Sequence, residues 1–129
     1  MNRLSNRLYI SVIAAFLALG PWQALYAQEE GAPAFLQNIN DIPLMPGLYE
    51  MLEEGVVFDK PGGRIAAAEA ITDIDQAAEI QSFYSHVLPR MGWVPAGVNA
   101  YIREGEVLRI AIEDQGRDRI VHFTVSPQP

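Results

Sequence analysis

The sequence predicts an α+β fold: a single small domain in which one helix packs on one face of an antiparallel β-sheet, in the order β-β-α-β-β-β. Three patterns lead to this prediction. A helical stripe of apolar residues lies in the middle of the chain, two short strand-like runs precede it, and three alternating runs with tight connections follow it. A chain of 129 residues allows one domain. We expect this domain at 55–127, after an extended segment at 28–54 that contains proline and glycine.

The two runs before the helix form a predicted hairpin. Val56-Val57-Phe58 and Arg64-Ile65-Ala66 flank a Lys-Pro-Gly-Gly sequence, which is typical of a turn. Pairing Phe58 with Ile65 places Val56 opposite Ala67 on the same face of the sheet. Residues 66–70 are rich in alanine, so a helix is the alternative for the second run.

The helix is predicted from its start signal, its apolar stripe and its end signal. Asp73 can begin it, with Gln76 as the partner in a capping box. Pro89 should loosen its last turn, and Gly92 suits the left-handed position that ends a helix. The apolar residues at three- and four-residue spacing are Ala77, Ile80, Phe83, Tyr84, Val87, Leu88 and Met91.

Three runs after Gly92 predict a three-stranded meander. A three-residue loop at 104–106 sets Ile102 opposite Leu108 and Ala100 opposite Ile110. A second turn at 116–117 sets Ile110 opposite Phe123. All three strands then present apolar side chains to one face, which the helix stripe would cover.

Residues 28–54 are interrupted by proline and glycine, and no helical or strand period persists in them. The sequence therefore predicts an extended segment. Its apolar part at 42–49 has two interpretations. It either folds back onto its own domain or docks on another envelope protein, because an extended, proline-bearing strip loses little entropy on binding. The docking residues would be Leu44, Met45, Leu48 and Tyr49.

The first residues have the three parts of a secretory signal. Arg3 and Arg7 precede an uncharged run at 8–19, and a stretch with small residues at 24–27 follows. We predict cleavage between Ala27 and Gln28, which would place the protein in the periplasm or outside the cell. The alternative is an uncleaved signal that tethers the chain to the membrane.

Composition excludes several classes of function. The absence of cysteine excludes a disulfide framework, a thiol nucleophile and a cysteine-ligated zinc. The net charge of −7 argues against a nucleic-acid binder. His86 and His122 lie far apart in the sequence without ligand spacing, and no phosphate-binding loop is present. We therefore expect no metal and no cofactor.

One polar cluster is predicted on the sheet face that points away from the helix. An exposed strip of aromatic, guanidinium, imidazole and hydroxyl groups suits an anionic or carboxylate-bearing ligand. It also suits the outer face of any soluble antiparallel sheet, where long polar side chains pair across strands. In the predicted registers the cluster comprises Tyr101, Arg103, Arg109, His122 and Thr124.

Four stretches resemble a known group of proteins: 41–48 (Asp-Ile-Pro-Leu-Met-Pro-Gly-Leu), 57–65 (Val-Phe-Asp-Lys-Pro-Gly-Gly-Arg-Ile), 83–93 with its Phe-Tyr, Leu-Pro and Gly-Trp pairs, and 103–108 (Arg-Glu-Gly-Glu-Val-Leu). They are similar to small exported proteins of Gram-negative bacteria that carry no assigned function. The resemblance implies an envelope location and one small domain. It implies no catalytic residue, cofactor or substrate.

These observations favour a non-enzymatic periplasmic interaction or binding module, such as an accessory subunit of an envelope complex. One alternative is a small envelope hydrolase or ligand-binding protein that uses the sheet face around His122. Another is a structural protein tethered to the membrane by its uncleaved signal.

Overall fold

The computed structural model describes residues 34–75 and 77–129. The predicted signal, its cleavage site between Ala27 and Gln28, and the capping role of Gln76 therefore lie outside the described residues. The described residues belong to one structural unit. Within the described part, no helix is long and apolar enough to cross a membrane.

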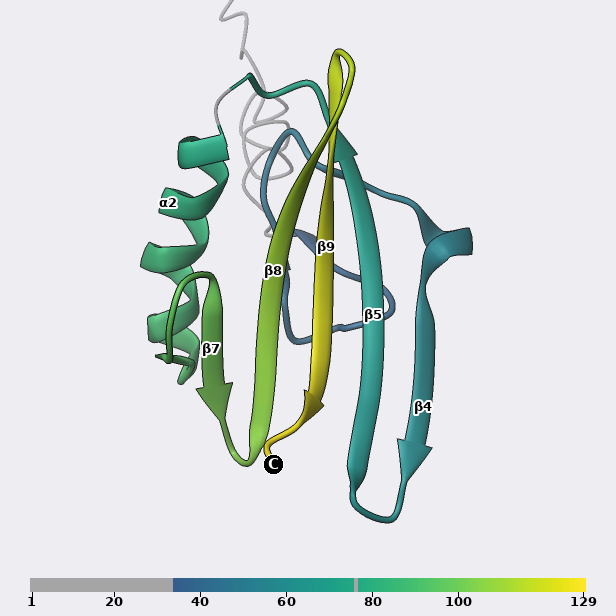
Figure 1. Cartoon of the computed structure of the whole chain (residues 1–129), viewed down its shortest axis with the longest axis vertical. Helices are drawn as coiled ribbons and strands as arrows, with labels where there is room; N and C mark the ends of the chain where they lie inside the picture. Colours follow the sequence, from purple (N-terminus) through teal and green to yellow (C-terminus); the bar gives the residue numbers. More distant parts are fainter. Residues whose placement is uncertain (1–33, 76) are drawn as a thin grey trace, which may run out of the picture. The chain divides into compact units, whose positions relative to one another are not determined.

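The prediction of an α+β domain is confirmed. The chain runs through β4 (Val56–Lys60), β5 (Gly63–Thr72), helix α2 (Ala77–Val87), β7 (Ala100–Arg103), β8 (Glu106–Gln115) and β9 (Asp118–Pro127). These strands lie side by side in the order β4-β5-β9-β8-β7, and all pairs are antiparallel (Figure 1).

Short elements extend this sheet at both sides. β3 (Tyr49–Glu50) pairs with the end of β5, and a 3-10 turn, η1 (Leu52–Glu54), connects β3 to β4. β6 (Val94–Pro95) pairs with β7. β1 (Ala34–Phe35) and β2 (Pro43–Leu44) form a separate two-stranded sheet.

Two of the three predicted registers are confirmed. Phe58 pairs with Ile65 and Val56 with Ala67, and residues 66–70 are strand rather than helix. In the last hairpin Ile110 pairs with Phe123.

The predicted β7–β8 register was wrong by one residue. Ile102 pairs with Val107 instead of Leu108, because the turn contains two residues, Glu104 and Gly105. Both have positive φ, 48° and 79°, which matches the twist of the flanking strands. Since side chains alternate along a strand, this slip exchanges the two faces of β7.

Helix α2 follows the predicted stripe and end signal. Ile80, Tyr84 and Leu88 are fully buried. The last turn tightens into η2 (Leu88–Met91) at Pro89, and Gly92 ends it with φ 90°. The backbone N–H of Trp93 then donates to the carbonyl of Leu88, which closes the helix end.

The covered face of the sheet carries the core. Alanines of β5 and larger residues of β9, β8 and β7 lie under α2 and under segment 34–50, which passes behind β9 and β5 in the view of Figure 1. The small β5 side chains leave room for this irregular segment. The sheet residues of this core cluster are Ala66, Ala68, Ala70, Tyr101, Leu108, Ile110, Val121, Phe123 and Val125.

Segment 34–50 folds back onto its own domain, which was one of the two predicted interpretations. Every third residue is buried from Leu36 to Leu48. Met45 and Leu48 are only 7% and 4% exposed, and Leu44 packs against the same core. These three side chains therefore cannot form a docking strip, because the core of the domain already covers them. Tyr49 alone of the four proposed docking residues is exposed.

Candidate functional site

Three of the five residues in the predicted polar cluster lie together on the open sheet face. Arg109 on β8 stands opposite Thr124 on β9, and His122 stands beside Ala111, as the confirmed β8–β9 register requires. Arg109 and Thr124 are exposed, and His122 is partly buried. Tyr101 and Arg103 were wrongly placed in this cluster, because the one-residue slip in β7 turns them to the covered face.

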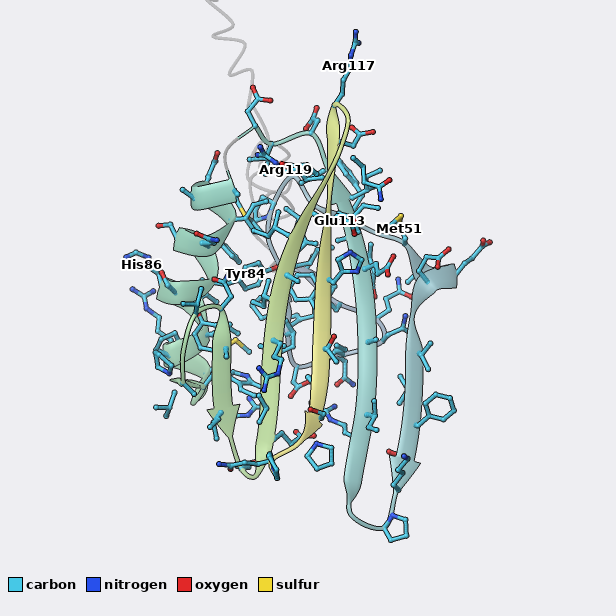
Figure 2. All side chains as sticks on the ribbon, in the orientation of Figure 1. Met51, Tyr84, His86, Glu113, Arg117 and Arg119 are labelled. Carbon is cyan, nitrogen blue, oxygen red and sulfur yellow. The ribbon has the colours of Figure 1, made fainter. Side chains whose placement is uncertain are left out.

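His122 is held between two carboxylates on this open face. Its Nδ1 lies 3.0 Å from Glu69 Oε1 on β5, and its Nε2 lies 3.0 Å from Glu113 Oε2 on β8. Figure 2 marks Glu113 on β8. Glu69 is directly opposite His122 in the β5–β9 ladder. The two contacts therefore link β5, β9 and β8 through one imidazole ring.

This arrangement leaves His122 without a free ring nitrogen. A general base must accept a proton from the reacting group through an unengaged nitrogen. With a carboxylate on each side, His122 is suited to linking strands rather than to proton transfer. Within the described part of the chain, no group of three or more histidine and acidic residues has the geometry of a metal site.

The other histidine, His86, makes only local contacts on helix α2. His86 points away from the sheet on the outer side of α2 (Figure 2). Its Nδ1 lies 2.7 Å from the carbonyl oxygen of Ser82, and Ser85 Oγ donates to that same carbonyl. Ser85 Oγ also lies 3.5 Å from His86 Nδ1, so these contacts are local to one exposed helical turn, and no acidic side chain of the described residues hydrogen-bonds to this imidazole.

On the covered face, Tyr101 is buried and Arg103 contacts other residues of the domain. Tyr101 is buried, and this burial raises the pKa of its hydroxyl. Arg103 stacks on Trp93, with its guanidinium carbon 4.3 Å from the ring centroid, and its Nη1 donates to the carbonyl of Met91 at 3.1 Å. Its Nη2 also pairs with the carboxylate of Asp41.

Asp41 is the centre of a larger ion-pair network at this end of the covered face. It bridges Arg103 and Arg64, whose Nη2 lies 3.1 Å from Asp41 Oδ2. Arg64 also holds Glu106 through two contacts of 2.8 and 3.1 Å. The hydrogen bond with Glu106 raises the pKa of Arg64, and the charge of Asp41 acts in the same direction. The network therefore fastens segment 34–50 to β5, β7 and β8.

A different surface, which the sequence analysis did not single out, lies at the β4 edge. Three consecutive apolar side chains are exposed there: Val56 is 44%, Val57 50% and Phe58 59% exposed. Among the described residues, β4 pairs with β5 alone, so its second edge carries no partner strand. Natural proteins usually protect such an edge with charged residues, proline or a bulge, because its unpaired backbone N–H and C=O groups can hydrogen-bond to a strand of another chain.

The Val-Val-Phe run was visible in the sequence as a strand signal. The sequence alone did not indicate that this strand lies at the end of the sheet. Its edge position follows from β9 pairing with the other side of β5, which is a long-range contact. Glu69 and Asp41 were missed for the same reason, since each contacts side chains that are distant in sequence.

No protein-family model, curated protein or solved structure matches this chain. The geometry of these surfaces is therefore the basis on which a role is assigned to the chain.

Proposed function

We propose that this chain is a non-catalytic interaction module that binds a protein partner by adding a strand to the β4 edge. The main observation that supports this proposal is the exposed run Val56-Val57-Phe58 on an edge strand. In strand addition, backbone hydrogen bonds along the free edge give affinity, and alternate side chains give specificity. Val56 and Phe58 lie on the open face with Ile65 and Ala67, and Val57 lies on the other side.

The chemistry of the remaining side chains supports a binding role over a hydrolytic one. His122 has a carboxylate on each ring nitrogen, and His86 lies on an exposed helical turn. A hollow of about 800 Å³ opens between η2, β6 and β7, and it is lined by Met91, Val94, Ile102 and Arg103 among others. In the sheet, β7 lies two strands from β9, which carries His122, so the hollow and the histidine do not combine into one site.

The module would act in the cell envelope. The signal-like features of residues 1–27, with Arg3 and Arg7 before an uncharged run, support export. Intact-mass analysis of the protein from the periplasmic fraction tests this part. A mass that begins at Gln28 is expected. A mass that retains Arg3 and Arg7 would favour the membrane-tethered alternative.

Capture in intact cells tests the binding surface. A photo-crosslinking amino acid at Phe58 should trap a protein partner, and the same group at the exposed Val98 should not. A C-terminal tag after Pro129 allows the adducts to be isolated for mass spectrometry. Val57→Asp should abolish the adduct, because it places a charge on the binding edge. Equal trapping at both positions, or none at Phe58, would contradict the proposal.

A further inference from the structure

The segment 94–98, which begins in β6 and leads to β7, presents apolar side chains directly to solvent. Its sequence is Val-Pro-Ala-Gly-Val, and all five residues are exposed. Val94 is 62% exposed and Val98 is 93% exposed, the highest fraction among the large apolar side chains of the described residues. A side chain exposed to this degree projects from the surface. The segment is therefore a convex apolar protrusion, which we call the 94–98 loop.

The backbone holds Val98 at the tip of this loop. The N–H of Ala96 donates to the carbonyl of Ala100 at 2.8 Å, so the three residues between them are closed into a tight turn. Gly97 and Asn99 on either side of Val98 have positive φ, 125° and 52°. Ala100 itself is buried and anchors the end of the loop in the domain. The exposure of Val98 is therefore a consequence of the turn geometry.

The surroundings of the loop are basic, although the chain as a whole is acidic. The stretch 80–103 contains no aspartate or glutamate, whereas the sequence has 16 acidic residues and a net charge of −7. Arg90 is exposed on η2, which contacts β6 at the start of the loop. Arg109 is exposed on β8 opposite Ala100, where the loop ends. Two exposed guanidinium groups therefore flank the apolar tip, and the next acid in the sequence, Glu104, follows the far end of β7.

We propose that the 94–98 loop docks on a membrane surface that contains anionic phospholipids. Val94 and Val98 enter the boundary of the acyl chains, and Arg90 and Arg109 attract the phosphates. Apolar insertion combined with nearby basic side chains is the general basis of interfacial membrane binding. This surface goes beyond strand addition at β4, because β4 and β6 lie at opposite edges of the sheet.

Two features favour a lipid surface over a protein partner. The loop lacks the tryptophan and tyrosine side chains that dominate the energy of protein interfaces, and no side chain in 94–98 can form a hydrogen bond. A fluid acyl region requires neither hydrogen bonds nor a matching shape from a convex protrusion. The net negative charge does not prevent the contact. At about 0.15 M salt, exposed charges more than about 8 Å apart are largely screened, so the flanking arginines outweigh distant acids.

Vesicle binding with matched variants tests the apolar tip. The protein isolated from cells is sedimented with vesicles of phosphatidylcholine alone, and with vesicles of equal parts phosphatidylcholine and phosphatidylglycerol. We expect stronger binding to the mixed vesicles. Val98→Asp should weaken this binding about tenfold, whereas Val57→Asp, the same change at an exposed valine of β4, should not. A wild-type chain that binds neither vesicle, or equal losses for the two variants, would overturn the proposal.

A second pair of variants tests the charge. Arg90→Gln should weaken binding to the mixed vesicles about fivefold and leave binding to phosphatidylcholine unchanged. Arg117→Gln is the matched control, because Arg117 is exposed at the turn between β8 and β9 and its loss changes the net charge equally. Equal effects of both variants would contradict the proposal, since net charge rather than the position beside the loop would then govern binding.

A solvent-sensitive fluorophore locates the contact. The chain contains no cysteine, so Val98→Cys provides a single thiol for labelling. Its emission should shift to the blue when mixed vesicles are added, whereas the same label on Phe58→Cys, at a position 59% exposed, should not shift. A shift at both positions, or at Phe58 alone, would overturn the proposal.

The photo-crosslinker at Val98 separates this inference from the proposed function. A protein adduct at Val98 in intact cells would assign the loop to a protein partner and overturn the lipid contact. Failure of vesicle binding leaves strand addition standing where a protein is still trapped at Phe58. Absence of a protein adduct at Phe58 would overturn strand addition and leave the membrane contact of the loop intact.

Discussion

Replacing Tyr84 with phenylalanine tests how segment 34–50 is held on the domain. The Tyr84 hydroxyl donates to the carbonyl of Pro43 at 2.9 Å and accepts from the N–H of Met45 at 3.2 Å. Figure 2 shows Tyr84 on the sheet side of α2. Its ring contacts Phe123 edge-to-face at a centroid distance of 5.3 Å. Phenylalanine keeps this packing and removes only the hydroxyl.

The expected cost follows from the groups left without a partner. Tyr84→Phe leaves one backbone carbonyl and one backbone N–H without their partner in a buried region, and each such group costs about 1–3 kcal/mol. We expect the free energy of unfolding to fall by about 3 kcal/mol, from a total of roughly 5–15 kcal/mol for a domain of this kind. Ser85→Ala is the matched control, because it removes an exposed hydroxyl one residue away.

Urea unfolding provides the assay. Trp93 is the only tryptophan after residue 27 and is buried, so its fluorescence reports the folded state. Tyr84→Phe should lower the unfolding midpoint without changing the slope, whereas Ser85→Ala should leave the midpoint in place. A loss below about 0.5 kcal/mol for Tyr84→Phe would refute the argument, because the hydroxyl would then not hold the segment.

The same variant has a signature in pH. Burial raises the pKa of Tyr84 above its ordinary value of 10, with the hydrogen bond from Met45 acting weakly in the opposite direction. Above pH 10 the unfolded chain releases this proton and the folded chain keeps it. Stability should therefore fall with rising pH, by about 1.4 kcal/mol per pH unit for one such group. In Tyr84→Phe, stability should fall less steeply as the pH rises above 10. A shallower fall should remain, because burial also raises the pKa of Tyr101.

Three further predictions concern the network, the helix end and the open face. Asp41→Asn should cost about 2 kcal/mol in urea unfolding, because two guanidinium groups lose a carboxylate. Gly92→Ala should cost about 1 kcal/mol because of its φ of 90°, whereas Gly62→Ala, whose added Cβ meets open space, should cost much less. His122→Ala should leave partner capture at the β4 edge unchanged, and loss of a cellular phenotype with intact folding would instead favour a ligand or catalytic role for that face.

The hairpin at 104–105 explains why two residues of the predicted polar cluster, Tyr101 and Arg103, were misplaced. Glycine at the second position suggested one left-handed residue, which led to a three-residue loop. The structure uses both Glu104 and Gly105 with positive φ. Glutamate is not among the residues that favour this conformation, so the sequence carried no signal for the shorter turn. The resulting slip moved Tyr101 and Arg103 from the open face to the core side.

The sequence of segment 34–50 does contain a pattern that corresponds to its burial. Leu36, Ile39, Ile42, Met45 and Leu48 recur at every third position and are all buried. This spacing fits neither the helical period nor the alternation of a strand, and the separating prolines and glycine hide it further. By contrast, the helix and the β4–β5 and β8–β9 hairpins were predictable because their apolar periods and turns are local.

The ion-pair network gives a physical reason for the motifs on which the family resemblance is based. Each of the four stretches contributes to the network or to the stack: Asp41 belongs to 41–48, Arg64 to 57–65 and Trp93 to 83–93, whereas Arg103 and Glu106 both belong to 103–108. The side chains of all four acidic and basic residues are 20–27% exposed, so each charge needs a close partner. A sequence that preserves these stretches preserves the fastening of segment 34–50 to the sheet. Such motifs therefore stabilise this fold, and under the proposed function the surface that selects a partner lies outside the network, at the β4 edge.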